Sequence, residues 1–435
     1  MKTLSPQSIA LYKLKKQGIS LYPYQKKGLN WLLHREKNSV GGLLCDEMGL
    51  GKTIQMISLI LASKLKNTLL ILPASLLLQW KTQLEKFSDY IKVHLYHGTH
   101  TMRTIPIFND NKNVVITSYN LVINDVNKLS EVEWDRIILD ECHYIRNPKS
   151  VIFNKLMLLN PAKKWGITGT PIQNYLSDLE VLFRFLNYEK DYIKLYIENL
   201  ITKHIIRRTK QDVIHEHNEL DLPPLSIKNI QFNIKEKKEL DLQQDITRQG
   251  LNPLELILRK KQLSVSPQIY LNGMARKFRK PLKKWNKKNL KFDFIIKRIR
   301  EQSADNRIIV FTTFNYEIEY LSQKLKTLNI NVSYINGRVP NETRKTIMED
   351  DNIQVLLVQI DCGGTGLNLQ KYNIAYFTSP PWNPSLEDQA IARLYRIGQK
   401  KEVHIYRIII NKTIDKYINH VQKVKRKLIR KYIKY

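Results

Sequence analysis

Short runs of apolar residues recur along the chain, each four or five residues long and bordered by glycine or acidic residues. Between them, apolar positions return at the spacing of amphipathic helices. Continuous apolar strands of this length are typical of parallel sheets that helices cover on both faces. The runs form two groups of five, at 42–45, 68–72, 114–117, 136–139 and 165–168, and at 308–311, 332–335, 355–358, 374–377 and 403–407.

Between about 177 and 290 this rhythm changes, because strand patterns become rare and lysine-rich helical patterns replace them. The pattern therefore predicts an α/β protein with two lobes joined by a mainly helical insertion. We expect a first lobe at 1–190, an insertion at 191–290, a second lobe at 291–422 and a basic tail at 423–435.

Composition narrows the class of protein. The chain has 435 residues, of which 43% are hydrophobic, enough to bury a sizeable core in each of two or three domains. No apolar stretch approaches the roughly 18 residues of a membrane helix, and the start lacks the apolar core of a signal peptide. The three cysteines, Cys45, Cys142 and Cys362, lie far apart, which argues against a disulfide framework or a zinc site. The sequence thus predicts a soluble intracellular protein.

The formal net charge of +31 points to a polyanionic partner, most often nucleic acid. Two runs without acidic residues hold much of it, with nine Lys and Arg at 276–291 and seven at 423–434. Removing both leaves 31 − 16 = +15, so the rest of the chain is basic too. Each run is either a solvated face or nuclear-import signal, or a set of phosphate contacts, and the sequence leaves both readings open.

A candidate phosphate loop follows the first apolar run. It reads DEMGLGKT over 46–53 and precedes a helical pattern. Backbone amides of such a loop cradle phosphates, while Lys52 can neutralise them and the Thr53 hydroxyl can ligate Mg²⁺. The strict GxxxxGK[ST] pattern has glycine at the first position, where this chain has Asp46.

An acidic pair, Asp140 and Glu141, ends the apolar run RIILD and begins the string DECH. A carboxylate at the C-terminal end of a parallel strand faces the crevice where α/β proteins bind nucleotides. We expect Asp140 to hold Mg²⁺, partly through water, and Glu141 to orient and deprotonate the attacking water.

At this point the sequence resembles the SWI/SNF-type ATPases, the DNA-translocating branch of helicase superfamily two. The resemblance is collinear from residue 21 to about 423. In the first half it rests on LYPYQ (21–25), DEMGLGKTIQ (46–55), LPASLLLQW (72–80), TSY (117–119), DECHYIRN (140–147) and TGTPIQN (168–174).

The motifs between the lobes distinguish this branch from RNA helicases, and they are RRTKQDV (207–213), LPP (222–224) and LRKKQLSVSP (258–267). In the second lobe the resemblance rests on Asn336-Gly337, GGTGLNL (363–369), WNP (382–384), QAIARLYRIGQ (389–399) and TID (413–415). The chain departs from the family at Ser264, where cysteine is usual, and at Gln359, where serine is typical. The sequences of these motifs are similar to those of post-replication-repair ATPases, whose RING insertion needs paired Cys and His ligands. We expect no RING and no ubiquitin-ligase activity here.

The resemblance implies two RecA-like lobes that bind ATP between them, with Mg²⁺ as cofactor. The ATP-binding residues that it implies are Gln25, Asp46, Met48, Gly49, Leu50, Gly51, Lys52 and Thr53. The implied catalytic residues are Lys52, Asp140, Glu141, Arg393 and Arg396, and the implied metal ligands are Thr53 and Asp140. The two arginines come from the second lobe, so hydrolysis should require the lobes to close.

The resemblance also implies residues for coupling and for DNA. Thr168, Thr170 and Gln389 would couple hydrolysis to motion. The implied DNA contacts are Thr117, Ser118, Asn336, Gly337, Gly366 and Trp382. Because these contacts go to the phosphate backbone, we expect little sequence preference.

The expected function is ATP-dependent translocation on double-stranded DNA, which would remodel chromatin or other protein–DNA complexes, including nucleosomes. The alternative enzyme is a strand-separating DNA or RNA helicase of the DExH type, and a third reading is a catalytically weak nucleic-acid clamp. We expect a nuclear location and no membrane partner. Richness in Ile, Lys, Asn and Tyr fits an AT-rich genome, so a cytoplasmic viral factory or a virion is the alternative location.

Overall fold

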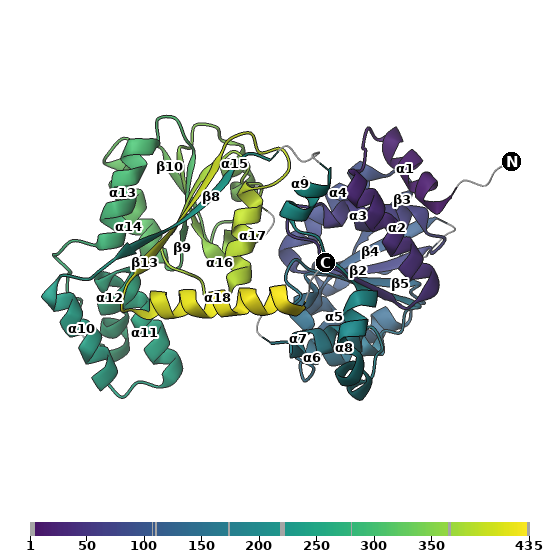
Figure 1. Ribbon diagram of the computed structural model, residues 1–435, viewed down its shortest axis with the longest axis horizontal. Coiled ribbons are helices and arrows are strands. Elements are labelled where there is room, and N and C mark those ends of the chain that lie inside the picture. The colour runs from purple at the N-terminus through teal and green to yellow at the C-terminus, as the bar shows by residue number, and fades with distance from the viewer. Residues whose placement is uncertain are drawn as a thin grey trace. The chain divides into compact units, whose positions relative to one another are not determined.

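The computed structural model describes residues 5–106, 108, 111–172, 175–217, 222–279, 281–363 and 367–432. The chain forms two compact units: the first holds the described residues before 222 and after 427, and the second holds 222–427. Each unit contains one parallel sheet with helices on both faces (Figure 1).

The first sheet has seven strands in the order β3-β4-β2-β5-β6-β1-β7, and each neighbouring pair is parallel. Its strands are β1 (Gly41–Leu44), β2 (Asn67–Leu72), β3 (Ile91–Leu95), β4 (Lys112–Ser118), β5 (Arg136–Asp140), β6 (Lys163–Ile167) and β7 (Ile205–Ile206). The α-helices that begin in this unit are α1 (Pro6–Lys16), α2 (Pro23–Asn38), α3 (Lys52–Ala62), α4 (Leu77–Phe87), α5 (Tyr119–Ser130), α6 (Val151–Leu158), α7 (Ser177–Phe185), α8 (Lys190–His204) and α9 (Lys210–His217). Three short 3₁₀ turns are η1 (Ala74–Leu76), η2 (His100–Met102) and η3 (Cys142–Ile145).

Successive residues of each strand point to opposite faces of the sheet, so its apolar runs supply two cores. Leu69 and Ile71 pack with helices α5 to α8, whereas Leu70 and Leu72 pack with helices α1 to α4. A strand buried on both faces needs a continuous apolar run, which is why the runs do not alternate with polar residues.

The second sheet has six parallel strands in the order β10-β11-β9-β12-β13-β8. They are β8 (Leu225–Phe232), β9 (Ile308–Thr312), β10 (Val332–Ile335), β11 (Val355–Gln359), β12 (Ile374–Phe377) and β13 (Val403–Ile410). The helices are α10 (Lys237–Arg248), α11 (Pro253–Val265), α12 (Pro267–Phe278), α13 (Leu290–Gln302), α14 (Asn315–Lys326), α15 (Asn341–Glu349), α16 (Ile360–Gly363), α17 (Pro384–Leu394) and α18 (Ile414–Tyr432). Figure 1 shows α13 and α14 on one face of this sheet and α16 and α17 on the other, consistent with its two separate cores.

The α/β fold with two parallel-sheet lobes is confirmed, and each of the ten predicted apolar runs falls on a strand, although 42–45 and 165–168 extend one residue past β1 and β6. Three further strands were not predicted. Strand β7 has only two residues, while β3 and β8 lie at sheet edges and alternate apolar with polar residues. An edge strand is partly solvated, so it lacks the continuous apolar run that served as the strand signal.

The range predicted as a helical insertion, 191–290, is divided between the two units. Strand β7 pairs with β1 of the first sheet, and β8 pairs with β13 of the second along eight residues. Within this range, only the helices α10 to α12 form an insertion, and they share a small hydrophobic core. Likewise, α18 runs without a break from Ile414 to Tyr432, so the predicted boundary at 422 falls inside a helix. Among the described residues, no helix is long and apolar enough to cross a membrane.

Candidate nucleotide-binding site

The loop that links β1 to α3 has the backbone of a phosphate loop. Gly49 and Gly51 adopt positive φ angles of 92° and 74°, which glycine accepts without steric cost. A Cβ at Gly51 would lie 2.5 Å from the Gln25 side chain, so the close approach also requires glycine. Lys52, the first residue of α3, donates from Nζ to the Asp46 carbonyl at 2.8 Å. The loop therefore ends at a helix N-terminus, where backbone amides can bind an anion.

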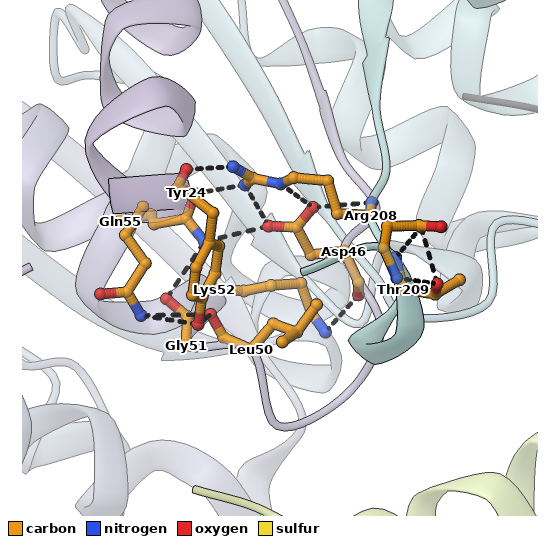
Figure 2. A network of polar contacts seen from close by, with 10 residues as sticks. Tyr24, Asp46, Leu50, Gly51, Lys52, Gln55, Arg208 and Thr209 are labelled. Carbon is orange, nitrogen blue, oxygen red and sulfur yellow. Dashed lines mark hydrogen bonds and ion pairs between the residues drawn. The ribbon is translucent and has the colours of Figure 1, made fainter. Parts of the chain in front are cut away.

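Asp46 holds this loop through Arg208. The Asp46 side chain is fully buried, and its Oδ1 accepts from the Arg208 amide at 3.0 Å and from Nε at 2.9 Å. Its Oδ2 accepts from the Arg208 guanidinium and from Gln55 Nε2, the latter at 3.0 Å (Figure 2). The carboxylate predicted to bind ATP thus points into the fold, because a buried charge needs a partner and Arg208 supplies it.

The segment that follows β7 runs along the phosphate loop and hydrogen-bonds to it. Cys45 donates its amide to the Ile206 carbonyl at 2.7 Å, and Glu47 donates its amide to the Arg208 carbonyl at 2.8 Å. In return, the Lys210 amide donates to Glu47 Oε2 at 2.9 Å. The RRTK segment is therefore a structural part of the phosphate loop.

Gln25 and Tyr24, at the start of α2, support the same loop from another side. Tyr24 Oη donates to the Leu50 carbonyl at 2.9 Å, and Gln25 Nε2 donates to the same carbonyl at 3.2 Å. Gln25 is 4% exposed. The Arg208 guanidinium lies over the Tyr24 ring, 5.3 Å from its centroid (Figure 2). Gln25, one of the residues predicted to bind ATP, thus lies against the phosphate loop.

Asp140 ends β5 and is held by aromatic residues from two other motifs. Its Oδ2 accepts from Trp80 Nε1 at 2.6 Å, and its carbonyl accepts from Tyr119 Oη at 2.8 Å. Burial, then the charge of Glu141, raise the pKa of Asp140 to about 6, against the opposing Trp80 hydrogen bond and Lys52 charge. The positive charge of Lys52 thus favours the ionised form of this carboxylate.

Glu141 connects the acidic pair to the predicted coupling segment. It adopts the left-handed conformation at φ 50°, and its Oε2 lies 3.2 Å from His143 Nδ1. The same Nδ1 lies 3.3 Å from Thr168 Oγ1, which accepts from the Thr170 amide at 3.1 Å. A continuous polar chain therefore joins Glu141 to both threonines. A non-glycine residue with positive φ also marks this turn as a functional candidate.

The donor set fits Mg²⁺, a hard cation that prefers oxygen ligands. Asp140 offers a buried carboxylate that Trp80 orients, and Thr53 offers a hydroxyl on the first turn of α3. In the part of the chain that the structure describes, no cluster of three or more His, Cys, Asp or Glu side chains could hold a metal by itself. Magnesium bound here would thus be shared with a phosphate ligand, as P-loop sites do.

The predicted second-lobe residues lie on and after α17. Gln389 and Arg393 are partly exposed on this helix, and Arg396 follows it, with a pKa that burial lowers. The helix is anchored by Glu387, which is fully buried and accepts from Arg407 Nε at 2.6 Å. The structure thus gives these side chains a rigid base inside the second unit.

The predicted DNA contacts differ in accessibility. Thr117 and Ser118 end β4 and are buried, so their side chains are not at the surface. In the second unit Trp382 is 42% exposed, and Asn336 lies beside a cavity of about 670 Å³ that opens between α14, β10 and α15. The amide of the exposed Gly337 donates to Gln359 Oε1 at 3.4 Å. Gly366 lies outside the described residues, as do Gln173 and Asn174.

Several residues of the site were not among the predicted site residues. They are Gln55, Trp80, Tyr119, His143 and Arg208. Each belongs to a motif that the sequence had already singled out, so the motif was the available signal. Their contacts are made through tertiary structure, which spacing along the chain does not reveal.

Known proteins share these motifs. Residues 24–192 match the SNF2-related domain, and residues 290–398 match the helicase conserved C-terminal domain. An "Uncharacterized ATP-dependent helicase" of Mycoplasma pneumoniae is 31% identical over 432 residues, covering 92% of this chain and 41% of the relative. The "ISWI chromatin-remodeling complex ATPase ISW2" of Saccharomyces cerevisiae is 28% identical, covering 89% of this chain and 39% of the relative. The chain spans about two fifths of the length of these curated relatives.

A solved structure, "Sulfolobus solfataricus SWI2/SNF2 ATPase core in complex with dsDNA", is 26% identical, covers 100% of this chain and has a TM-score of 0.47. The two domain matches fall one in each unit and in the expected order, with the phosphate loop and acidic pair in the first match. This chain therefore has the SNF-type ATPase core of helicase superfamily two, with an SNF2-related domain followed by a helicase conserved C-terminal domain.

Proposed function

We propose that the protein hydrolyses ATP and uses the energy to translocate on double-stranded DNA. The observation that carries the proposal is the position of His143, which lies 3.2 Å from Glu141 and 3.3 Å from Thr168, at the same sheet edge as the phosphate loop. It joins a candidate catalytic base to a candidate coupling segment. The names of the relatives, an ATP-dependent helicase and a chromatin-remodelling ATPase, support the same activity.

Each residue of the first unit has a distinct role in this proposal. Backbone amides of 49–52 bind the phosphates, and Lys52 leaves the Asp46 carbonyl to neutralise them. Glu141 orients a water for in-line attack and accepts its proton. Asp140 and Thr53 would hold Mg²⁺, which would neutralise charge on the phosphates.

Arg393 and Arg396 complete the proposed reaction from the second unit. A guanidinium aimed at the γ-phosphate stabilises the charge that develops during phosphoryl transfer. Gln389, on the same helix as Arg393, would couple the step to motion, together with Thr168 and Thr170. This role is the one that the family motif QAIARLYRIGQ implies.

Duplex DNA is the proposed track, and nucleosomes or other DNA-bound proteins are the proposed objects that are moved. Contacts to Asn336, Gly337, Gly366 and Trp382 would read the backbone, with little sequence preference. Thr117 and Ser118 would contribute through backbone atoms, because their side chains are buried. A nuclear location remains a prediction, since the relatives include a bacterial and a yeast protein and neither supports a viral origin.

The test is Glu141→Gln, which keeps the shape of the side chain and removes the base. We expect unchanged DNA binding and a loss of ATPase of about a hundredfold or more. Lys52→Ala should weaken ATP binding, whereas Arg396→Ala should spare ATP binding and slow hydrolysis. Unchanged turnover in Glu141→Gln would contradict the assigned base.

The mode of action needs a separate experiment. ATPase rates with bare duplex, nucleosomes, single strands and RNA, measured side by side, should be highest with duplex-containing substrates. A translocase should displace a triplex strand without unwinding a forked duplex. Efficient unwinding of the fork would instead support the strand-separating helicase.

A further inference from the structure

The basic run at 276–291 lies in the second unit, between the last turn of α12 and the first turn of α13. The structure gives its cations different environments. Lys291 is buried and paired with Asp415 at 2.6 Å, and Lys277 is paired with Glu255 at 2.5 Å. Six cations of the run are described as exposed and lie outside these two pairs: Arg276, Arg279, Lys283, Lys284, Lys287 and Lys288.

Four of these cations are lysines in the connection 281–288, which we call the lysine loop. One side chain of α12 fixes its backbone at two points. Gln268 donates from Nε2 to the Lys283 carbonyl at 2.9 Å and accepts at Oε1 from the Trp285 amide at 2.6 Å. At its far end Asn289, which is 9% exposed, accepts from the Phe292 amide at 3.0 Å and caps α13.

These contacts order the lysine loop before any ligand binds. Its lysines form two adjacent pairs, 283–284 and 287–288, on either side of the half-buried Trp285. Trp285 Nε1 donates to the Lys288 carbonyl at 3.4 Å, a further contact across the second pair. Because the backbone is already held, binding loses less conformational entropy than it would for a free tail.

The chemistry of the loop suits an evenly charged polymer. It contains no acidic residue, and its cations are lysines, compact charges that need no bidentate geometry. Duplex DNA carries about one charge per 1.7 Å of axis, so a fixed row of ammonium groups meets phosphates in any register. Neutralising them releases condensed counterions, which makes the contact favourable at low salt.

We propose that the lysine loop is an accessory contact for the phosphate backbone of duplex DNA, separate from the contacts at 336, 337, 366 and 382. The identity of the ligand rests on the proposed function. The loop raises DNA affinity and takes no part in hydrolysis, since its lysines lie outside the residues assigned to ATP.

The first test replaces Lys283, Lys284, Lys287 and Lys288 with alanine in the full chain. Binding of a fluorescent duplex is measured between about 50 and 200 mM salt. We expect affinity to fall about tenfold or more and the slope of log K against log[salt] to become shallower by about 2, the loss of two or three phosphate contacts. The ATPase rate without DNA should not change.

A matched variant controls for net charge. Lys37, Lys64, Lys86 and Lys92 are exposed lysines of the first unit, and their replacement removes the same charge. This variant should keep nearly the wild-type slope and affinity. An equal loss in both variants would show a general charge effect and overturn a local site.

A second variant, Gln268→Ala, removes both backbone tethers and leaves every lysine. The slope should stay that of the wild type, because it counts phosphates, while affinity should fall several-fold, because the loop must now be ordered on binding.

Unchanged affinity in both the lysine and Gln268 variants would overturn the proposal. Binding of polyglutamate, an acidic polypeptide, is measured for the same variants. Unchanged DNA binding together with a loss of polyglutamate binding would also overturn the proposal, because it would identify an acidic protein as the partner. A wild-type ATPase that ignores DNA would contradict the proposed function, yet these binding measurements would still test the loop.

Discussion

Arg208 and Asp46 show how one pair of residues can replace a glycine in a nucleotide-binding motif. Asp46 stands where the strict pattern has glycine, and Arg208, 162 residues later, neutralises it. Arg208 also donates from Nη2 to Gln55 Oε1 at 2.7 Å. Removing one partner of a buried pair costs far more than removing both, because a lone buried charge remains.

We therefore expect Arg208→Gln to lower the free energy of unfolding of the first unit by about 3–5 kcal/mol. The double variant Arg208→Gln with Asp46→Asn should recover much of this loss, because no buried charge is left. Chemical denaturation measures both. Lys37→Gln, which changes an exposed cation of the same unit, is the control and should change stability little. A double variant no more stable than Arg208→Gln would contradict the pairing.

Glu239 on α10 provides a prediction about pH. Burial, then the charge of Glu236, raise the pKa of Glu239 to about 7, opposed by Lys291. The folded state then binds a proton more tightly than the unfolded state, so this group stabilises at low pH. Its contribution is lost as pH rises from the ordinary carboxyl range through about 7.

Glu239→Gln should accordingly be more stable than the wild type at pH 8, by about 1 kcal/mol or more, and should lose this advantage near pH 4. Thermal unfolding of the two proteins at both pH values measures the difference. Glu402→Gln changes an exposed carboxyl and should give little pH-dependent difference. A stability gap that does not change with pH would contradict the role of burial.

At the scale of elements, Asp415 fixes the start of α18 inside the second unit. It is fully buried and accepts from Lys291 Nζ on α13 at 2.6 Å, from Ser264 Oγ on α11 at 3.0 Å and from the Ile410 amide of β13 at 3.1 Å. Ser379 Oγ donates to the same side chain at 3.2 Å. One carboxylate thus joins two helices, the sheet and the loop after β12. Ser264, where the resemblance leads one to expect cysteine, donates one of these hydrogen bonds.

This junction predicts a strong dependence on Asp415. Asp415→Ala should lower the free energy of unfolding of the second unit by about 3–5 kcal/mol, because Lys291 would remain buried without its partner. The double variant Lys291→Met with Asp415→Ala should be more stable than Asp415→Ala. Denaturant titration followed by circular dichroism measures this. Equal stability of single and double variants would mean that the ion pair is unimportant.

Across the whole molecule, the lysines and arginines that give the net charge of +31 lie in different environments. Some cations are internal, as Lys291 and Arg208 show, and Lys52 is assigned to ATP. Many other Lys and Arg side chains are exposed in each unit and suit a polyanionic track. If about five phosphates are neutralised, log K for duplex DNA should fall with log[salt] at a slope of roughly −4 to −5. Titrations at several salt concentrations measure this slope, and a value near zero would mean that the charge serves another purpose.

Most of the fold could be predicted because most strands are buried on both faces. Such strands consist of continuous apolar runs, which can be recognised in the sequence. The sequence did not predict β3 and β8, because partly solvated edge strands alternate polar with apolar residues. It predicted the phosphate loop and acidic pair from local order alone, since both motifs are contiguous in the chain. It did not predict the burial of Thr117, because the same residues can end an exposed or a covered strand.

The resemblance to SWI/SNF-type ATPases, the two α/β lobes and the candidate site residues Lys52, Thr53, Asp140 and Glu141 could all be predicted from the sequence. These depend on contiguous motifs and on apolar periodicity, which are local properties of a chain. The folded chain was needed to show that Asp46 serves the fold, that Trp80 orients Asp140 and that Gln268 holds the lysine loop. Each of those roles depends on which side chains meet across elements distant in sequence, and it is packing around a shared core that brings them together.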